Sequence, residues 1–562
     1  MSGTACTIES LQADPAANWF GQRLCGLLVP DASSLVSPVA WSLHQWMQGH
    51  TCLDLTGSVT ARSGEKGAFD MLEARVPAPW LARLQEHPAV VRAAEGSMEA
   101  IESPLVLEGS KLFLGRWRQL EISVASALLG RGAQAASWCA DPEASRRIEA
   151  FVASRGPGLH EDQSRAVRLG ATRRLAVVTG GPGTGKTFVA ARVIEAVLET
   201  GPQPVLLLAP TGKAAARLQA SVLQAAAKGA VTDRAAECIR SLKAGTVHSA
   251  TLRRGGEDLR AARLIVVDET SMIDLERMHE LLRLAHPQAS VLLLGDPHQL
   301  ASVEAGSVLS DIVHGSDHPG HPLATCVVAL RKSHRFAEHG GVARLAAAVN
   351  AGRADEVVAL LGEGPEGIRW IRASTPRQVV EESVRALADS PKGTRVLCGH
   401  RHGADGSVRV NTAVERQRGI SASRTLYAGR PILVTVNDEV TGLRNGDTGE
   451  LAWEAGSWVA RFDGGMPAVP AAKLPAHETA YAMTIHKTQG SEYERVIVAL
   501  PARPSPVLTR ELLYTGFTRT RGDLVVIAAE ATLRAAIERP IRRSSGLRER
   551  LRTGLSAPPG PG

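Results

Sequence analysis

The chain has 562 residues, more than one hydrophobic core organises, and this length predicts about three or four domains. Its 44% hydrophobic and 22% charged residues are typical of a folded soluble protein, and no stretch approaches the roughly 20 apolar residues of a membrane-spanning helix. The net charge of +7 favours a polyanionic partner, and the seven scattered cysteines, never spaced as Cys-x-x-Cys, argue against a disulfide framework or a zinc site.

Residues 1–150 combine helical patterns with one short apolar stretch at 104–114. At the centre of this stretch, Glu108-Gly109-Ser110 is typical of a turn between two strands. No catalytic constellation occurs in this region. Residues 1–11 hold Glu9 and lack a basic segment followed by an apolar run, so we expect no secretory signal and a cytoplasmic location.

From residue 151 to 330 the sequence alternates short apolar runs with helical patterns. Four of the runs are almost wholly apolar: 175–179, 205–209, 264–267 and 291–294. Such runs are typical of central strands in a parallel sheet that helices cover on both faces. The region is therefore predicted to form one α/β domain.

A second α/β domain is predicted over residues 331–545. Its predicted strands are 395–398, 496–500 and 524–527. Between about 425 and 478 the pattern changes to short strand-like segments around a strong tight-turn signal, Arg444-Asn445-Gly446-Asp447, which predicts a small inserted β module. The basic, Pro/Gly-rich end at 546–562 has little apolar surface to bury and is predicted to be disordered.

The strongest functional signal is a glycine-rich loop, Gly180-Gly181-Pro182-Gly183-Thr184-Gly185-Lys186-Thr187. It lies between an apolar strand and an amphipathic helix at 188–198, the context that a nucleotide-binding P-loop requires. Backbone N–H groups of such a loop surround phosphates at a helix N-terminus, where the helix dipole favours negative charge. We expect Lys186 to reach the β- and γ-phosphates of ATP and Thr187 to hold Mg²⁺.

Two acids, Asp268 and Glu269, follow the apolar run at 264–267. A strand that ends in two carboxylates can place one beside the metal and the other beside the attacking water. Asp268 is therefore the predicted Mg²⁺ ligand and Glu269 the predicted general base. After the next apolar run, Gln299 could hydrogen-bond both the γ-phosphate and the water. Upstream, the amide of Gln163 could recognise the adenine edge; the alternative is an ordinary exposed helix residue.

This set of segments resembles the motifs of superfamily 1 helicases in order and spacing. Further matching segments are 208–217, 246–252, 330–336, 482–492 and 513–521. The resemblance covers roughly residues 155 to 530 and implies two tandem RecA-like P-loop domains with ATP between them. It also implies that Arg335 and Arg519 touch the γ-phosphate and that Glu492 contacts the ribose. His334 stands where the family usually has Tyr, which weakens the case for stacking on the adenine.

The same resemblance implies a set of DNA contacts on the loops of both α/β domains. They are Thr211, Lys213, His248, Thr484, His486 and Lys487. Threonine, lysine and histidine side chains can bind phosphate or stack on a base without reading sequence. Taken singly, each could equally be a solvated loop residue, and such a groove does not by itself exclude RNA.

Within superfamily 1, residues 429–439 and 443–449 resemble the small SH3-like β insertion of RecD-like enzymes, which travel 5′ to 3′. Residues 49–55 and 103–116 resemble the mostly helical N-terminal domain of the RecBCD subunit, which binds a partner. The resemblance implies a motor that acts on single-stranded DNA and duplex ends beside RecB- and RecC-like subunits. We expect no nuclease site in the chain, because it holds no second cluster of acids.

Two alternatives stay open at this point. One is a stand-alone RecD-like helicase, although such an enzyme would carry a longer helix-hairpin-helix front. The other is a regulatory subunit that no longer hydrolyses ATP. Against that alternative, every polar group that hydrolysis needs is present in the sequence.

Overall fold

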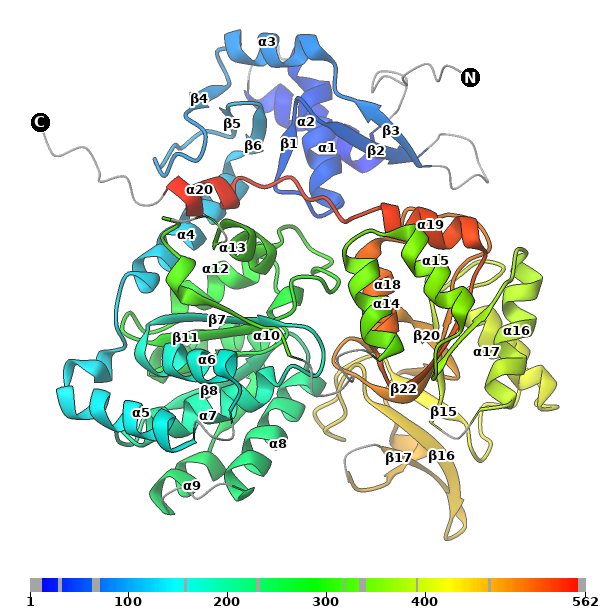
Figure 1. Ribbon diagram of the computed structural model, residues 1–562. Coiled ribbons are helices and arrows are strands. Elements are labelled where there is room, and N and C mark those ends of the chain that lie inside the picture. Colours follow the sequence, from blue (N-terminus) through cyan, green and yellow to red (C-terminus); the bar gives the residue numbers. More distant parts are fainter. Residues whose placement is uncertain are drawn as a thin grey trace, which may run out of the picture.

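The computed structural model of the chain contains two parallel sheets, a mixed four-stranded sheet and a two-stranded hairpin in the N-terminal region, and one small antiparallel module (Figure 1). The structure describes residues 13–28, 33–62, 71–155, 159–228, 233–316, 318, 320–332, 340–390, 393–462 and 466–553. In these ranges, no helix is both long and apolar enough to cross a membrane.

The N-terminal region packs helices on a four-stranded sheet. Its elements are α1 (Pro15–Leu28), α2 (Ser33–Met47), α3 (Ala78–Glu86), β1 (Cys52–Asp54), β4 (Val91–Ala93), β5 (Leu105–Glu108), β6 (Lys111–Leu114) and a second hairpin of β2 (Ser58–Arg62) and β3 (Met71–Arg75). The sheet order is β1-β6-β5-β4. The predicted turn is confirmed, because β5 and β6 pair antiparallel with Leu105 opposite Leu114. Buried Val39 and Trp41 of α2 share one core with Leu107 of the sheet.

The first α/β sheet has six parallel strands in the order β12-β7-β11-β10-β8-β9. They are β7 (Leu175–Gly180), β8 (Val205–Ala209), β9 (Lys243–Thr246), β10 (Leu264–Val267), β11 (Ser290–Gly295) and β12 (Val327–Leu330). All four predicted strands of this region are confirmed. They read as unbroken apolar runs because alternate residues point to opposite faces and both faces are buried: Val177 and Val267 lie in one core, Val178 and Val266 in the other.

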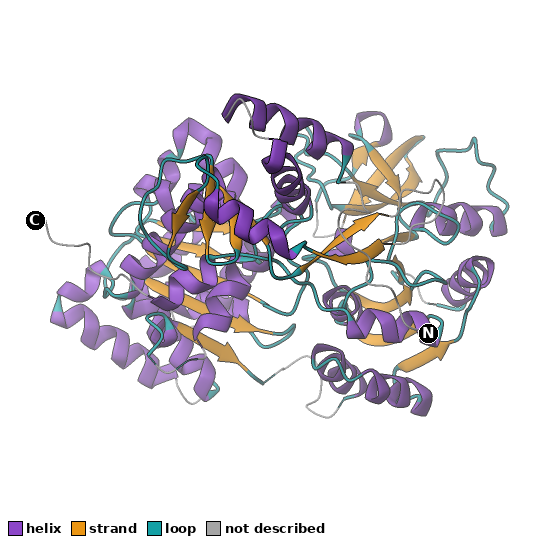
Figure 2. Cartoon of the chain, turned by 90° about the horizontal axis from the view of Figure 1, so that it is seen from above, coloured by secondary structure: helices purple, strands orange, loops and turns teal. Residues whose placement is uncertain are grey.

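Helices cover both faces of this sheet, as seen from above in Figure 2. One face is covered mainly by α5 (Pro142–Arg155), α6 (Glu161–Thr172), α7 (Lys186–Leu198), α8 (Gly212–Lys228) and α9 (Asp233–Arg240). The other is covered mainly by α4 (Gly115–Gly132), α10 (Val247–Leu252), α11 (Glu257–Ala261), α12 (Leu275–Leu284) and α13 (Val308–Ser316). Helix α4 thus joins the N-terminal region to this domain, since its Leu128 shares a core with Leu175 and Ile265.

The second α/β sheet has five parallel strands in the order β13-β22-β21-β14-β20. They are β13 (Ile368–Ile371), β14 (Arg395–Cys398), β20 (Ala482–Thr484), β21 (Tyr493–Ala499) and β22 (Thr520–Ile527). One face packs on α14 (Gly341–Asn350), α15 (Ala354–Glu363), α18 (Arg510–Phe517) and α19 (Glu530–Glu538). The opposite face packs on α16 (Pro376–Ala388) and α17 (Ser407–Gln417). The predicted strands of this domain are confirmed.

The small β module is a five-stranded antiparallel sheet in the order β18-β17-β16-β15-β19. Its strands are β15 (Pro431–Val434), β16 (Thr448–Glu454), β17 (Ser457–Phe462), β18 (Val469–Pro470) and β19 (His477–Thr479). The predicted tight turn is confirmed: the Asp447 carboxylate accepts the Arg444 N–H at 2.7 Å, and Gly446 takes a φ of 96° that suits glycine. The SH3-like character of the module and the domain limits stay predictions.

The predicted disorder of residues 546–562 is wrong for Leu547–Thr553, which form helix α20. This helix packs beside α4 and α13, so the C-terminal part of the chain returns to the N-terminal region (Figure 1). Fully buried Arg550 donates to Glu108 at 2.8 Å and lies 3.4 Å from Glu121. The sequence interpretation counted the positive charge of this segment and did not foresee that distant carboxylates neutralise it. Residues 554–562 lie outside the described residues.

Candidate functional site

The polar residues of the nucleotide motifs gather at the carboxyl edge of the first sheet. Lys186 follows β7, Asp268 follows β10 and Gln299 follows β11. Ligands bind at this edge in open parallel sheets, because the connecting loops and helix N-termini converge there. Helix α7 begins at Lys186, so the positive end of its dipole faces the glycine-rich loop.

The glycine-rich loop curls around the lysine ammonium. Gly183 and Gly185 have φ values of 78° and 90°, a region that side chains disfavour, so the loop needs glycine at both positions. Lys186 Nζ donates to the Gly180 carbonyl at 2.6 Å and to the Gly181 carbonyl at 3.1 Å. The loop therefore holds a cation against its inner carbonyl groups, at the N-terminus of a buried helix.

Gln163 lies under this loop and is buried, so the alternative of an exposed helix residue is wrong. Its Nε2 donates to the Thr184 carbonyl at 3.2 Å, and its Oε1 accepts the His160 N–H at 3.2 Å. A Cβ atom on Gly185 would lie 2.8 Å from Nε2, so the loop packs directly on the amide. The described bonds support the loop, while recognition of the adenine edge stays a prediction.

The two acids after β10 are held close together. Asp268 Oδ1 accepts the Glu269 N–H at 2.8 Å. Burial, and next the charge of Glu269, raise the pKa of Asp268 to about 6. Glu269 has a φ of 51°, a left-handed conformation that Ala455 alone shares among the described non-glycine residues. Such strain costs about 1–3 kcal/mol and persists mainly where function requires the geometry.

Asp296, directly after β11, connects the two α/β domains. Its Oδ2 accepts from Gln299 Nε2 at 3.3 Å and from the Tyr514 hydroxyl, in α18 of the second domain, at 2.9 Å. Burial, and next the carboxylate charge, raise the pKa of Tyr514, which keeps its hydroxyl a proton donor. A Cβ atom on Gly181 would lie 2.9 Å from the same hydroxyl oxygen. Tyr514 therefore touches both the phosphate loop and the loop that carries Gln299.

Further contacts join the domains beside this point. Arg217 of α8 binds Glu492 at 2.7 Å, and Arg521 binds the other oxygen of the same carboxylate at 3.2 Å. The Leu300 N–H donates to the Thr515 hydroxyl at 3.1 Å. The predicted ribose contact, Glu492, thus lies in an ion-pair network that spans the two domains.

Of the two arginines predicted to touch the γ-phosphate, the structure describes one. Arg519 is buried, and its guanidinium donates to the Thr515 carbonyl at 3.1 Å and the Ser491 carbonyl at 3.4 Å, both in its own domain. Arg335 and His334 lie at 333–339, outside the described residues. Contact of either arginine with the γ-phosphate stays a prediction.

On the first domain, the predicted DNA contacts lie at the sheet edge and near the β module. Thr211 precedes α8, and its hydroxyl accepts a backbone N–H of the first turn at 3.3 Å. Lys213 Nζ lies 3.4 Å from both the Gly446 carbonyl and the Thr448 hydroxyl of the module. His248 is exposed on α10. The module therefore approaches the predicted DNA-facing loop of the first domain.

On the second domain, the predicted DNA contacts lie at the end of strand β20 and in the turn directly after it. Thr484 ends β20, and His486 and Lys487 lie in the 3-10 turn Ile485–Thr488. Lys487 binds Glu478 of β19 at 2.5 Å. Burial lowers the pKa of His486, so near neutral pH this ring offers a face for stacking and a neutral nitrogen for hydrogen bonding, without charge.

Sequence reasoning identified the groups for phosphate chemistry but missed the groups that join the domains: Asp296, Arg217 and Tyr514. Asp296 carries a signal that could have found it, because it directly follows an apolar strand, as Asp268 does. Tyr514 carries none, since its partner Asp296 lies 218 positions away in the chain.

Three family descriptions match parts of the chain. Residues 20–113 match "RecBCD enzyme subunit RecD, N-terminal domain", residues 158–369 match "AAA domain" and residues 479–527 match "UvrD-like helicase C-terminal domain". The first match covers most of the region that holds α1 to β6. The other two include the phosphate loop and the Tyr514 segment, respectively.

Similar proteins extend over nearly the whole chain. The RecBCD enzyme subunit RecD of Mycolicibacterium smegmatis is 37% identical over 96% of this chain and 97% of its own length. The ATP-dependent RecD2 DNA helicase of Deinococcus radiodurans is 30% identical over 70% of this chain and 53% of its own length. Among solved structures, Bacteroides Pif1 bound to single-stranded DNA is a distant neighbour, with a TM-score of 0.41 and 18% identity over 66% of this chain and 92% of that one.

Proposed function

Because the chain belongs to the RecD family of RecBCD enzyme subunits, we propose that it moves 5′ to 3′ along single-stranded DNA as the ATP-driven helicase subunit of a RecBCD-type complex. In such a complex it would process duplex DNA ends for recombinational repair. The observation that carries the proposal has two parts. Lys186, Asp268 and Gln299 lie at one sheet edge, and the hydrogen bond between Asp296 and Tyr514 joins this edge to the second α/β domain.

ATP would bind between the two α/β domains. The contacts we propose are the loop from Gly180 to Thr187, the amide of Gln163 and the carboxylate of Glu492. Binding at Glu492 would compete with Arg217 and Arg521, which hold this carboxylate in the structure. The nucleotide would therefore exchange one set of interdomain contacts for another, which couples its binding to the relative position of the domains.

Mg²⁺ would be held by the Thr187 hydroxyl and the Asp268 carboxylate. These donors fit the ion, which in nucleotide sites takes few protein oxygens and leaves the other positions to phosphate and water. Burial, and next the negative charge of Glu269, raise the pKa of Asp268, and a cation between the two carboxylates would relieve their repulsion. Bound there, Mg²⁺ supplies charge neutralisation at the phosphates.

For hydrolysis, we assign proton abstraction from the attacking water to Glu269 and orientation of that water to Gln299. Lys186, Arg335 and Arg519 would stabilise the charge that spreads over the transferred phosphoryl group. Gln299 shares Asp296 with Tyr514, so a change at the γ-phosphate would reach the second domain through one carboxylate. Loss of phosphate would then loosen the contact between the domains.

DNA would follow the loops that carry the predicted contacts on both domains. The proposed set is Thr211, Lys213, His248, Thr484, His486 and Lys487. Opening and closing of the domains in each ATP cycle would tighten one group of loops while it loosens the other, which produces net movement. The N-terminal region would bind the RecB- and RecC-like partners, and DNA cleavage would belong to the RecB-like subunit.

Unwinding of short tailed duplexes tests the proposal. We expect the folded chain to unwind a 5′-tailed duplex in the presence of ATP and Mg²⁺, and not a 3′-tailed one. The Glu269→Gln variant should still bind ATP, because the phosphate loop is intact, yet unwind neither substrate. Preference for the 3′ tail would overturn the direction. Unwinding at a normal rate by Glu269→Gln would overturn the assigned base.

A further inference from the structure

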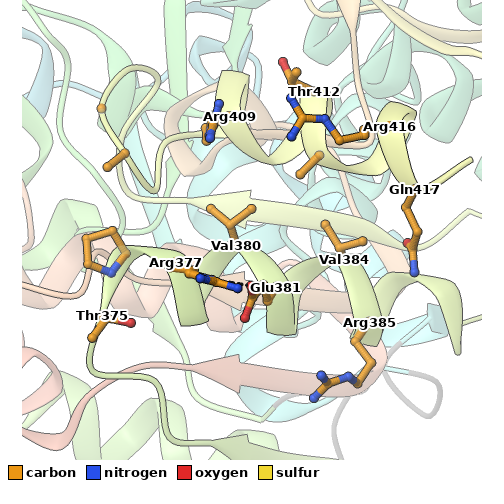
Figure 3. Close-up of a pocket in the computed structure, with 14 residues that line it drawn as sticks. Thr375, Arg377, Val380, Glu381, Val384, Arg385, Arg409, Thr412, Arg416 and Gln417 are labelled. Atoms are coloured by element: carbon orange, nitrogen blue, oxygen red, sulfur yellow. Dashed lines mark hydrogen bonds and ion pairs between the residues drawn. The ribbon is translucent and has the colours of Figure 1, made fainter. Parts of the chain in front are cut away.

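A groove lies between α16 and α17, apart from the residues of the nucleotide site (Figure 3). Its volume is about 1160 Å³. The two helices cover the face of the second sheet opposite to the one that α18 covers. Since α18 carries Tyr514, the groove opens on the side of the domain that points away from the phosphate loop. None of the nucleotide-binding or predicted DNA-binding residues lines it.

The groove has an apolar floor between two rows of arginines. Val380 and Val384 project from α16 toward α17 with 8% and 9% of their surface exposed (Figure 3), and half-buried Ala413 of α17 packs against the same core. Four arginines line it, two from each helix: Arg377, Arg385, Arg409 and Arg416. Glu381 is the one acid in the lining. The groove therefore combines apolar surface with an excess of positive charge.

The arginines of the two helices differ in their partners. Arg377 binds Glu381 at 2.7 Å, and Arg385 binds Glu382 at 2.6 Å. For Arg409 and Arg416, the described part of the chain shows neither a hydrogen bond nor an ion pair of the guanidinium group. Two exposed arginines thus line the groove beside its apolar floor.

The spacing of the arginines and valines suits the binding of another helix along the groove. Arg409 and Arg416 are seven positions apart on α17, two helical turns or about 10 Å. Val380 and Val384 are four positions apart on α16, so they form a continuous apolar stripe. A helix laid along the stripe would meet these two arginines with side chains that are themselves two turns apart.

We propose that this groove binds an amphipathic helix of a partner protein, with its apolar face on Val380 and Val384 and acidic residues two turns apart against Arg409 and Arg416. The two arginines favour acidic residues on the partner helix, and the apolar floor favours an apolar face on that helix. A nucleic acid fits the arginines but not the floor, because a phosphate backbone offers no apolar surface to the valines. The inference does not depend on the proposed ATPase and assigns the chain a docking surface apart from its N-terminal region.

A synthetic peptide of about 14 residues, matched to the roughly 20 Å of α16, serves as the probe. It carries leucines on one helical face and glutamates beside them, and its binding to the full chain is followed by fluorescence anisotropy. The first comparison peptide has the same composition in scrambled order, and a single-stranded oligonucleotide is the second. We expect the amphipathic peptide to bind at least about tenfold more tightly than the scrambled one, since only it can cover the floor.

The Arg409→Glu/Arg416→Glu variant should weaken binding of the amphipathic peptide at least about tenfold. The matched control, Arg146→Glu/Arg147→Glu on α5, changes the net charge equally on an exposed helix elsewhere and should bind as the wild type does. DNA-stimulated ATP hydrolysis should be unchanged in both variants, which separates this inference from the proposed function. No binding by the wild type, equal binding of the scrambled peptide, or loss of oligonucleotide binding alone in the groove variant would overturn the proposal.

Discussion

At the residue scale, one carboxylate connects the phosphate chemistry to the second α/β domain. Asp296 accepts from both Gln299 and Tyr514, and the Tyr514 hydroxyl also lies beside Gly181 of the phosphate loop. A buried carboxylate that holds two donors fixes the positions of both, because an alternative arrangement would leave a charge without partners. We therefore regard Tyr514 as a positioning residue for Gln299.

The Tyr514→Phe substitution tests this role. It removes the hydroxyl donor while it keeps the ring, and we expect the kcat of DNA-stimulated ATP hydrolysis to fall about tenfold, since one hydrogen bond to a charged group contributes about 1.5–3 kcal/mol. KM for ATP should change little, because the phosphate loop keeps its own contacts. The matched control is Tyr481→Phe, whose hydroxyl meets the Gly429 carbonyl away from the nucleotide site. A rise in KM at unchanged kcat would contradict a positioning role.

Residues of the candidate site could be predicted where the residues that they act with lie close by in the sequence, and not where those residues lie far away. The phosphate loop is contiguous, and Asp268 and Glu269 directly follow a strand, so residue type and order were enough to predict them. The left-handed backbone at Glu269 left no trace in the sequence, because glutamate has no preference for that conformation. The Arg217–Glu492 pair was equally hidden, since it exists only once the two domains have packed together.

At the element scale, helix α20 holds the C-terminal part of the chain against the N-terminal region. Its Arg550 lies in a fully buried cluster with Glu108, Glu121 and Arg118. A buried ion pair adds little net stability as a whole, but removal of one partner leaves the other charged and buried. Arg550 is therefore the most sensitive position of this helix.

We expect Arg550→Met to destabilise the docking of α20 by about 3–5 kcal/mol, because Glu108 and Glu121 lose a cation that they share. The matched control is Arg552→Met in the same helix, where the side chain is exposed and the effect should stay within about 0.5 kcal/mol. Thermal unfolding and limited proteolysis near residue 547 would measure both. Equal melting temperatures for the two variants would contradict a structural role for the buried cluster.

Asp311 of α13, beside α20, predicts a dependence of stability on pH. Burial, opposed in part by Arg548 at 3.7 Å, raises its pKa from 3.8 to about 7. Between about pH 4 and pH 7 the folded protein therefore keeps a proton that the unfolded chain releases, so this group makes stability fall as pH rises, by up to about 1.4 kcal/mol per unit.

The Asp311→Asn variant cannot release this proton. We expect its melting temperature to fall less than that of the wild type between about pH 5 and pH 8, with the difference concentrated below pH 7. The exposed residue Asp355, replaced in the same way, serves as the control and should leave the wild-type pH profile unchanged. A profile for Asp311→Asn that follows the wild type would contradict the raised pKa.

The elements themselves were predictable where burial leaves a clear pattern. The central strands of both parallel sheets were identified because both of their faces are buried and the runs are wholly apolar. Strands β1 and β4, of three residues each, are too short to carry a pattern and were not foreseen. Helix α20 was missed for another reason, because its burial depends on carboxylates from the other end of the chain.

At the scale of the whole molecule, the two α/β domains meet through a small number of polar contacts. Asp296 with Tyr514, Arg217 with Glu492 and Leu300 with Thr515 are hydrogen bonds or ion pairs that can exchange without disrupting either core. The hydrophobic cores of the two sheets are otherwise separate, and only Leu300, in the loop after β11, packs into a core of the second sheet among the described residues. This arrangement suits domains that move against each other while each stays folded.

The measurement that tests this account most directly is ATP hydrolysis by the chain, wild type and Lys186→Gln, with and without single-stranded DNA. Lys186 donates to two carbonyl groups of the phosphate loop, and glutamine keeps much of its length but removes the charge. We expect strong stimulation of the wild type by DNA and a fall of at least about a hundredfold in the variant. Hydrolysis that DNA does not stimulate, or that survives in a folded Lys186→Gln protein, would contradict it.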